Sequence, residues 1–253
     1  MAIVPAGHGW LWLKQALALL GKAPFAWLLV SMTYWILMAV IARLPYIGLA
    51  VGSLVMPALA MSFVAMCREL DRGRPLVPAL LVAGFRRNLP ALVTIGGLYL
   101  AATLAIFAAS ALLDGGALAR WMVLGKPPAA PPGEDTEMLW AVAVAFALWI
   151  PIQLAFWFAP ILAAWRDLPA VKALFFSFFA SLRNWRAFVV YAAAAGGVVA
   201  VVAALLFNLH RMKAGAALAP TLVFLFLVVA IPAYYASLYA SYRDVFPDEA
   251  PAT

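Results

Sequence analysis

The sequence predicts an all-helical membrane protein, a polytopic bundle of six transmembrane helices arranged as three hairpin repeats. The chain of 253 residues is 68% hydrophobic and only 11% charged, whereas soluble domains are about half apolar and about a quarter charged. Six stretches are also long enough to cross a hydrocarbon layer about 30 Å thick, which takes roughly 20 apolar residues. No segment shows the alternation over about ten residues that membrane barrel strands require, so we expect helices throughout.

The six expected spans are long runs of apolar residues. They cover roughly residues 24–42, 46–66, 89–112, 138–160, 187–208 and 218–240. A shorter segment that ends in basic or amide residues precedes each odd-numbered span, over residues 10–22, 78–88 and 169–185. We expect these segments to be cytoplasmic interfacial helices that turn into the membrane, with prolines near the start of a span at a helix N-terminus. Tryptophans at headgroup level contact both media, which is the position expected for Trp10, Trp12, Trp165 and Trp185.

An arginine followed at once by an acid ends each predicted hairpin. The pairs are Arg68-Glu69, Arg166-Asp167 and Arg243-Asp244. We interpret each arginine as an anchor that extends to the headgroups, and each acid as a cap for a following helix. A shared functional ring of the three pairs is the alternative. The pattern divides a single membrane domain, residues 1–253, into units of about 8–75, 76–167 and 168–244, with a short cytoplasmic tail over 241–253.

Basic residues are distributed unevenly between the two sides of this bundle. Twelve of the seventeen Lys and Arg residues fall on the side that holds both termini, and five on the other. Lys and Arg collect on the cytoplasmic side, so both termini are predicted to be cytoplasmic. An Ala-, Leu- and Arg-rich composition with few Lys is typical of a high-GC bacterial genome, which places the chain in a bacterial inner (plasma) membrane. No basic head precedes the first apolar region, so we expect no cleavable signal.

The basic side is the predicted contact surface. Its bilayer partner would be anionic headgroups, which attract each basic residue by about 1 kcal/mol, so the net charge of +7 requires no nucleic-acid partner. A protein partner or a second copy of the chain could use the same residues. The candidate contacts with headgroups or a partner are Arg68, Arg72, Arg86, Arg87, Arg166, Arg183 and Arg243.

Polar groups within the spans are scarce, and a packing role is favoured for most of them. Gln153, beside Pro151, is the most notable, as an interhelical hydrogen bond or part of a transport path. Gly48, Gly52 and the Gly196-Gly197 pair fit close helix contacts. Small residues form a packing stripe on the third interfacial segment: Ala170, Ala173, Ser177, Ser181 and Asn184. Hydroxyls that can bond to the preceding turn's carbonyl belong to Ser31, Thr33, Ser53, Ser62, Thr94, Thr103, Ser110 and Ser237.

The longest predicted connection runs from Asp114 to Glu137. Residues 117–124 could form one or two helical turns there, and the proline-rich stretch 126–133 should be extended. A solvated linker is favoured over a partner-binding loop.

No catalytic signature is present. His8 and His210 lie far apart, with no Cys or Asp at metal-ligand spacing. The sequence also lacks a nucleophile elbow, a phosphate loop and a dinucleotide fingerprint. We therefore expect no enzyme, no cofactor and no metal.

Three parts of the chain carry a resemblance that covers nearly its whole length. Pro5-Ala6-x-x-Gly9-x-x-Trp12, Gly73-Arg74-Pro75 and the run from Phe158-Ala159-Pro160 through Ser177 to Asn184 resemble an uncharacterised proteobacterial family of six-span inner-membrane proteins. The third part is more distantly similar to the membrane region attached to some glycerophosphodiester phosphodiesterases. The resemblance implies a fold and a location, and it carries no catalytic residues onto this chain.

Two hypotheses of function follow. The favoured one is a non-catalytic protein that organises lipids or scaffolds a partner complex through its interfacial helices and basic rim. The alternative is a small permease or transport accessory with a path near Gln153. Gly48 and Gly52 favour packing over a pore.

Overall fold

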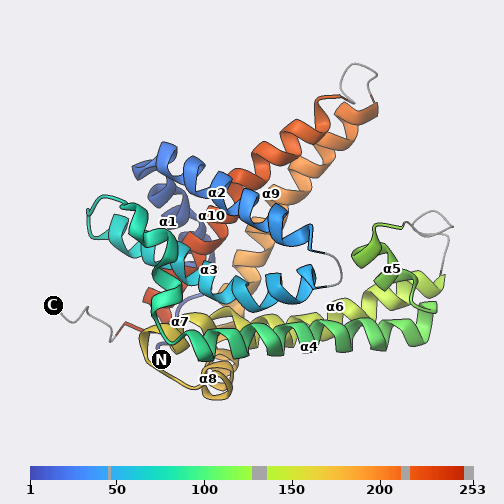
Figure 1. Cartoon of the computed structure of the whole chain (residues 1–253), viewed down its shortest axis with the longest axis horizontal. Helices are drawn as coiled ribbons and strands as arrows, with labels where there is room; N and C mark the ends of the chain where they lie inside the picture. Colours follow the sequence, from blue (N-terminus) through green and yellow to red (C-terminus); the bar gives the residue numbers. More distant parts are fainter. Residues whose placement is uncertain (45–46, 127–135, 212–216, 248–253) are drawn as a thin grey trace.

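The computed structural model describes residues 1–44, 47–126, 136–211 and 217–247. Six helical stretches in these ranges are long and apolar enough to cross a membrane, which confirms the predicted class and number of spans. They form three hairpins (Figure 1). The spans are α2 (Pro24–Ala42), α3 (Gly48–Asp71), α4 (Leu89–Asp114), α6 (Thr136–Trp157) continued by α7 (Ala159–Trp165), α9 (Trp185–Arg211) and α10 (Ala219–Val245).

Shorter helices precede the first, third and fifth spans. They are α1 (His8–Lys22), η1 (Pro78–Arg86), which is a 3₁₀ helix, and α8 (Ala170–Arg183). The expected helix in the long connection is also present, as α5 (Ala117–Leu124), while the proline-rich stretch after it lies mostly outside the described residues. Figure 1 shows α1, α7 and α8 at the end of the molecule that holds the N-terminus, and α5 at the other end. The division into three repeated units stays a prediction.

The packed core is confined to the end that holds α7. This helix is buried over residues 159–164, together with the second halves of α3 and α10 and the inner faces of α1 and α8. Burial differs between the spans when an apolar 18-residue stretch of each is compared. In α3, 56% of this stretch is buried, but only 6% is buried in the α6–α7 span and in α9. The hairpins α4–α6 and α9–α10 diverge from the packed end toward their loops (Figure 1). The rest of the described chain therefore leaves most of α6 and α9 uncovered.

A side chain from α8 bridges the break between α6 and α7. Pro160, in the first turn of α7, has no N–H and its ring interrupts the preceding helix. An unbroken helix would pair the Phe158 N–H with the Leu154 carbonyl, four residues earlier. Here the Ser177 hydroxyl lies between them: it accepts from the Phe158 N–H at 2.9 Å and donates to the Leu154 carbonyl at 3.0 Å. The small-residue stripe that contains Ser177 is buried, as predicted.

The predicted headgroup position of Trp12 is wrong. Its side chain is fully buried, with its ring 5.3 Å from that of Phe188 and 6.3 Å from that of Tyr191. The reason is that α1 lies against α9 and α10, so position 12 faces protein. Gly9 permits this approach, because a Cβ there would overlap the Ala187 carbonyl. Trp10 and Trp185 are exposed, as the prediction requires.

The predictions of close helix contacts have different outcomes for the glycines of α3 and those of α9. A Cβ on Gly48 would lie 2.6 Å from the Ile41 carbonyl oxygen, and one on Gly52 would lie 3.4 Å from the Met38 methyl carbon. Both glycines therefore lie where α3 comes close to α2. The prediction for Gly196-Gly197 is wrong: among the described residues, no neighbouring heavy atom lies within 4 Å of a Cβ at either glycine, because this part of α9 lies on the outside of the bundle.

Replacing Ser177 by alanine is expected to lower the free energy of unfolding by about 1–3 kcal/mol, because a buried N–H and a buried C=O lose their partner. Ser181 is equally buried on the same helix, and its hydroxyl has no hydrogen-bond partner in the described part of the chain, so Ser181→Ala should change stability by less than about 0.5 kcal/mol. Thermal unfolding in detergent can be followed by maleimide labelling of Cys67, which is buried and is the chain's one cysteine. Equal shifts for the two variants would contradict the bridging role.

Candidate functional site

Three arginines connect the three hairpins at the packed end. Each makes a contact with a residue near the end of another hairpin, so that together they close a ring. The contacts are Arg68 over the Trp165 ring at 4.6 Å, Arg166 over the Phe246 ring at 4.9 Å, and an ion pair of Arg243 with Asp71. A guanidinium over an aromatic face is attracted by the ring quadrupole. These are the arginines of the three predicted Arg-acid pairs.

The acids of those pairs do not cap helices, so that part of the prediction is wrong. Glu69 lies within α3, because the helix continues to Asp71, and pairs with Arg72 at 3.8 Å and Arg74 at 3.4 Å. Asp167 has a left-handed backbone (φ 51°), and α8 begins after Pro169 with no side-chain cap.

Asp244, the third acid, fixes α1 against α10. Its Oδ2 lies 2.6 Å from the Nδ1 of His8 and accepts the indole N–H of Trp12 at 2.8 Å. His8 is the first residue of α1, so this carboxylate also lies near the positive end of that helix. The backbone N–H of Ala2 donates to the Val245 carbonyl at 2.7 Å and ties the N-terminus to the same place.

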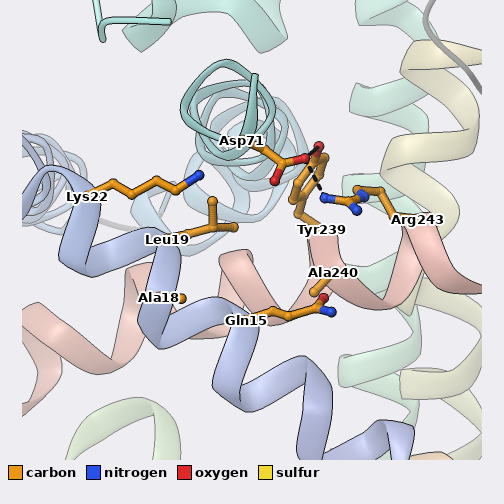
Figure 2. Close-up of a pocket in the computed structure, with 8 residues that line it drawn as sticks. All are labelled: Gln15, Ala18, Leu19, Lys22, Asp71, Tyr239, Ala240 and Arg243. Atoms are coloured by element: carbon orange, nitrogen blue, oxygen red, sulfur yellow. Dashed lines mark hydrogen bonds and ion pairs between the residues drawn. The ribbon is translucent and has the colours of Figure 1, made fainter. Parts of the chain in front are cut away.

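A polar cavity of about 210 Å³ lies beside the ring, between α1, α3 and α10. Lys22 and Arg243 extend toward Asp71 from opposite sides, and Gln15 lies below them (Figure 2). The residues that line the cavity are Gln15, Ala18, Leu19, Lys22, Asp71, Tyr239, Ala240 and Arg243.

The charges of this cavity do not cancel. Asp71 accepts hydrogen bonds from the Tyr239 hydroxyl at 3.0 Å and from the Arg243 guanidinium. The Lys22 ammonium donates to the Leu70 carbonyl at 3.2 Å and has further N–H groups to offer. Two cations thus line a cavity with one carboxylate, which leaves a positive excess. Ammonium and guanidinium donors beside each other suit an anionic oxygen ligand such as a phosphate.

The other predicted contact residues are distributed around this end. Arg86, Arg87 and Arg183 are exposed at the ends of η1 and α8, outside the cavity. Arg72 pairs with Glu69 and also lies outside it. Of the seven predicted arginines, Arg243 alone lines the cavity. Gln153 is half-buried on α6 and does not line it either.

Four polar residues of the cavity were missing from the predicted contacts. Gln15 and Lys22 belong to the polar face of α1, a signal that was visible in the first interfacial segment. Asp71 stands three residues after Arg68, as the last residue of α3. Tyr239 had no signal in an otherwise apolar span.

Six apolar helical stretches, joined at one end by polar and aromatic contacts, define a polytopic α-helical integral membrane protein. The chain is 38% identical, over 259 aligned residues, to a protein of Burkholderia thailandensis described as a probable inner membrane protein. The match covers 98% of this chain and 94% of that relative. The chain therefore belongs to the family of that inner membrane protein, whose function is unknown. No family model matches the sequence, and no solved structure matches it.

The contact of Arg68 with Trp165 is expected to contribute about 0.5–2 kcal/mol to stability, as a half-buried cation–π pair. A double-mutant cycle with Arg68→Ala and Trp165→Leu should show coupling of that size in unfolding free energy. The same cycle with Arg72→Ala in place of Arg68→Ala should show none, because Arg72 pairs with Glu69 on its own helix. Loss of the helical circular dichroism signal on heating in detergent measures each variant. Equal coupling in both cycles would refute the assignment.

Proposed function

We propose that this protein is a non-catalytic inner-membrane protein that binds anionic lipid headgroups at its packed end and organises lipids or a partner complex there. The observation that carries the proposal is the polar cavity with two cations and one carboxylate, surrounded by exposed arginines. Phosphate oxygens accept charge-assisted hydrogen bonds from both kinds of cation. Each basic residue near an anionic surface adds about 1 kcal/mol.

The packed end is proposed to be the cytoplasmic end. It holds the N-terminus, the last residues of α10 and the larger share of the basic residues, and such residues collect on the cytoplasmic side of inner membranes. A protein partner, or a second copy of this chain, would meet the same exposed arginines. The alternative of a transport path near Gln153 remains a prediction.

We also propose that the distant similarity to the membrane region of some glycerophosphodiester phosphodiesterases reflects a shared helix break. The residues that carry this similarity support the proposal through their roles here. Pro160 interrupts the span, Ser177 bridges the break, and Asn184 accepts a hydrogen bond from the Val4 N–H at 2.8 Å. A structure of such a region with no hydroxyl at this break would contradict the relationship.

Phosphatidylglycerol is expected to bind the purified chain more tightly than phosphatidylcholine, measured by counting lipid adducts in native mass spectrometry. Lys22→Gln removes one cation from the cavity and should weaken phosphatidylglycerol binding roughly 5-fold, the equivalent of about 1 kcal/mol. Asp71→Asn should strengthen it, because the variant removes the one negative charge and keeps an acceptor for Tyr239.

Arg211→Gln is the matched control, because it removes one positive charge at the far end of α9. Its effect on phosphatidylglycerol binding should be small. Equal effects of Lys22→Gln and Arg211→Gln, or equal binding of the two lipids, would overturn the headgroup site. Cross-linking in the native membrane followed by identification of co-purified lipids and proteins tests the organising role, and recovery of the bare protein would contradict it.

The proposed orientation predicts the behaviour of C-terminal reporter fusions. Alkaline phosphatase, which is active only outside the cytoplasm, should be inactive when fused after Thr253. The same reporter inserted after Lys126, in the connection that follows α5, should be active. High activity at the C-terminus would reverse the assignment and place the packed end outside.

A further inference from the structure

A second cavity, of about 440 Å³, lies between α2, α3 and α10 at a different depth. Its volume falls in the range of small-molecule sites, which are mostly apolar with a few placed polar groups. Its walls are largely aromatic and aliphatic, with Tyr34, Trp35, Phe63 and Tyr235 among them. None of the residues that line it is charged.

Two residues that line this cavity carry hydrogen-bond donors with no partner among the residues that the structure describes. The Ser31 hydroxyl and the Trp35 indole N–H are both buried and unpaired, and Ser31 as a whole is 1% exposed. The two residues are four apart on α2, so they lie on the same face of the helix. A buried donor without an acceptor costs about 1–3 kcal/mol of stability. Two such donors on one face of a helix are therefore unusual.

Ser31 differs from most other hydroxyls in the spans. Those of Thr33, Thr94 and Ser237 donate to the carbonyl four residues earlier, at 2.9, 2.8 and 2.9 Å. This was the sequence prediction for Ser31 as well, and it is wrong there. Two tyrosines that line the cavity have hydrogen-bond partners: Tyr34 donates to the Leu81 carbonyl at 2.8 Å, and Tyr235 donates to the Met56 sulfur at 3.6 Å.

The depth of the donors restricts the acceptor. At 1.5 Å per residue, Ser31 and Trp35 lie about 10 and 16 Å along α2 from its first residue, Pro24. The middle of a 30 Å hydrocarbon layer is about 15 Å from its surface. The ester carbonyls of phospholipids lie at the edge of that layer, outside the reach of these donors. The acceptor must belong to a molecule that dissolves in the hydrocarbon itself.

We propose that this cavity binds a lipid-soluble quinone, a flat ring with carbonyl oxygens on an apolar tail. One ring carbonyl accepts from the Ser31 hydroxyl and the Trp35 N–H. The ring lies against the aromatic side chains of Tyr34, Phe63 and Tyr235, which favour offset or edge contacts with another flat ring. This site is independent of the headgroup site, which lies at the membrane surface.

The test uses the full chain in nanodiscs of synthetic phospholipid without quinone. Decylubiquinone is the probe, and decylbenzene is the comparison, since it has a ring and tail but no carbonyl. Native mass spectrometry of the released protein measures both affinities. Decylubiquinone should bind the wild type tighter, and Ser31→Ala and Trp35→Phe should each weaken it roughly 5- to 10-fold, the effect of one lost hydrogen bond. Neither variant should alter decylbenzene binding.

Two further variants make the result specific. Thr33→Val removes a hydroxyl from the exposed face of the same helix, and decylubiquinone binding should be unchanged. Ala230→Leu adds bulk to the cavity wall and should abolish binding of both probes. Equal affinity for the two probes, or wild-type affinity for decylubiquinone in both Ser31→Ala and Trp35→Phe, would overturn the proposal and leave the cavity to acyl chains.

Discussion

In a bilayer, an apolar side chain gains little by exchanging lipid for another apolar side chain, so helices associate through close packing and polar contacts. This constraint explains where the hairpins of this protein meet. Their lipid-facing lengths diverge (Figure 1), while the ends near α7 are joined by the arginine ring, the contacts of Asp244 and the bridge made by Ser177. Each of these contacts joins polar or charged groups that the hydrocarbon of the bilayer cannot satisfy. The packed end is therefore the part that holds the hairpins to one another.

The class of the fold was predictable because it depends on composition and segment length alone, and the six expected spans agree closely with the observed helices. The small-residue stripe of α8 and the glycines of α3 were predictable for a related reason: small residues at helical spacing permit close approach wherever the partner lies. Gly196-Gly197 shows the limit of that inference. The pair is as small as the glycines of α3, but the structure places no neighbour against α9 there, and only the tertiary arrangement decides this.

The site was less predictable, because its contacts join residues far apart in the chain. Arg243 and Asp71 are 172 residues apart, and Asp244 reaches His8 across 236. The three Arg-acid pairs lie at or next to the ends of α3, α7 and α10, but local reasoning assigned the acids to the nearest helix starts. Two of them lie in last turns instead, since α3 and α10 continue past the pairs to Asp71 and Val245. A tertiary partner determined each role.

The polar and apolar cavities share α3 and α10, and this arrangement relates the two proposed sites. Tyr235 lines the apolar cavity, and Tyr239, one turn further along the same face of α10, lines the polar one. On α3, Phe63 and Asp71 are eight residues apart, about 12 Å along the axis. A phosphate at Lys22 and a ring beside Ser31 could therefore be bound at once without overlap. The helix that lies between the two cavities, α3, is the most buried of the spans and can move little. Each cavity should therefore bind its ligand with the same affinity whether or not the other cavity is occupied.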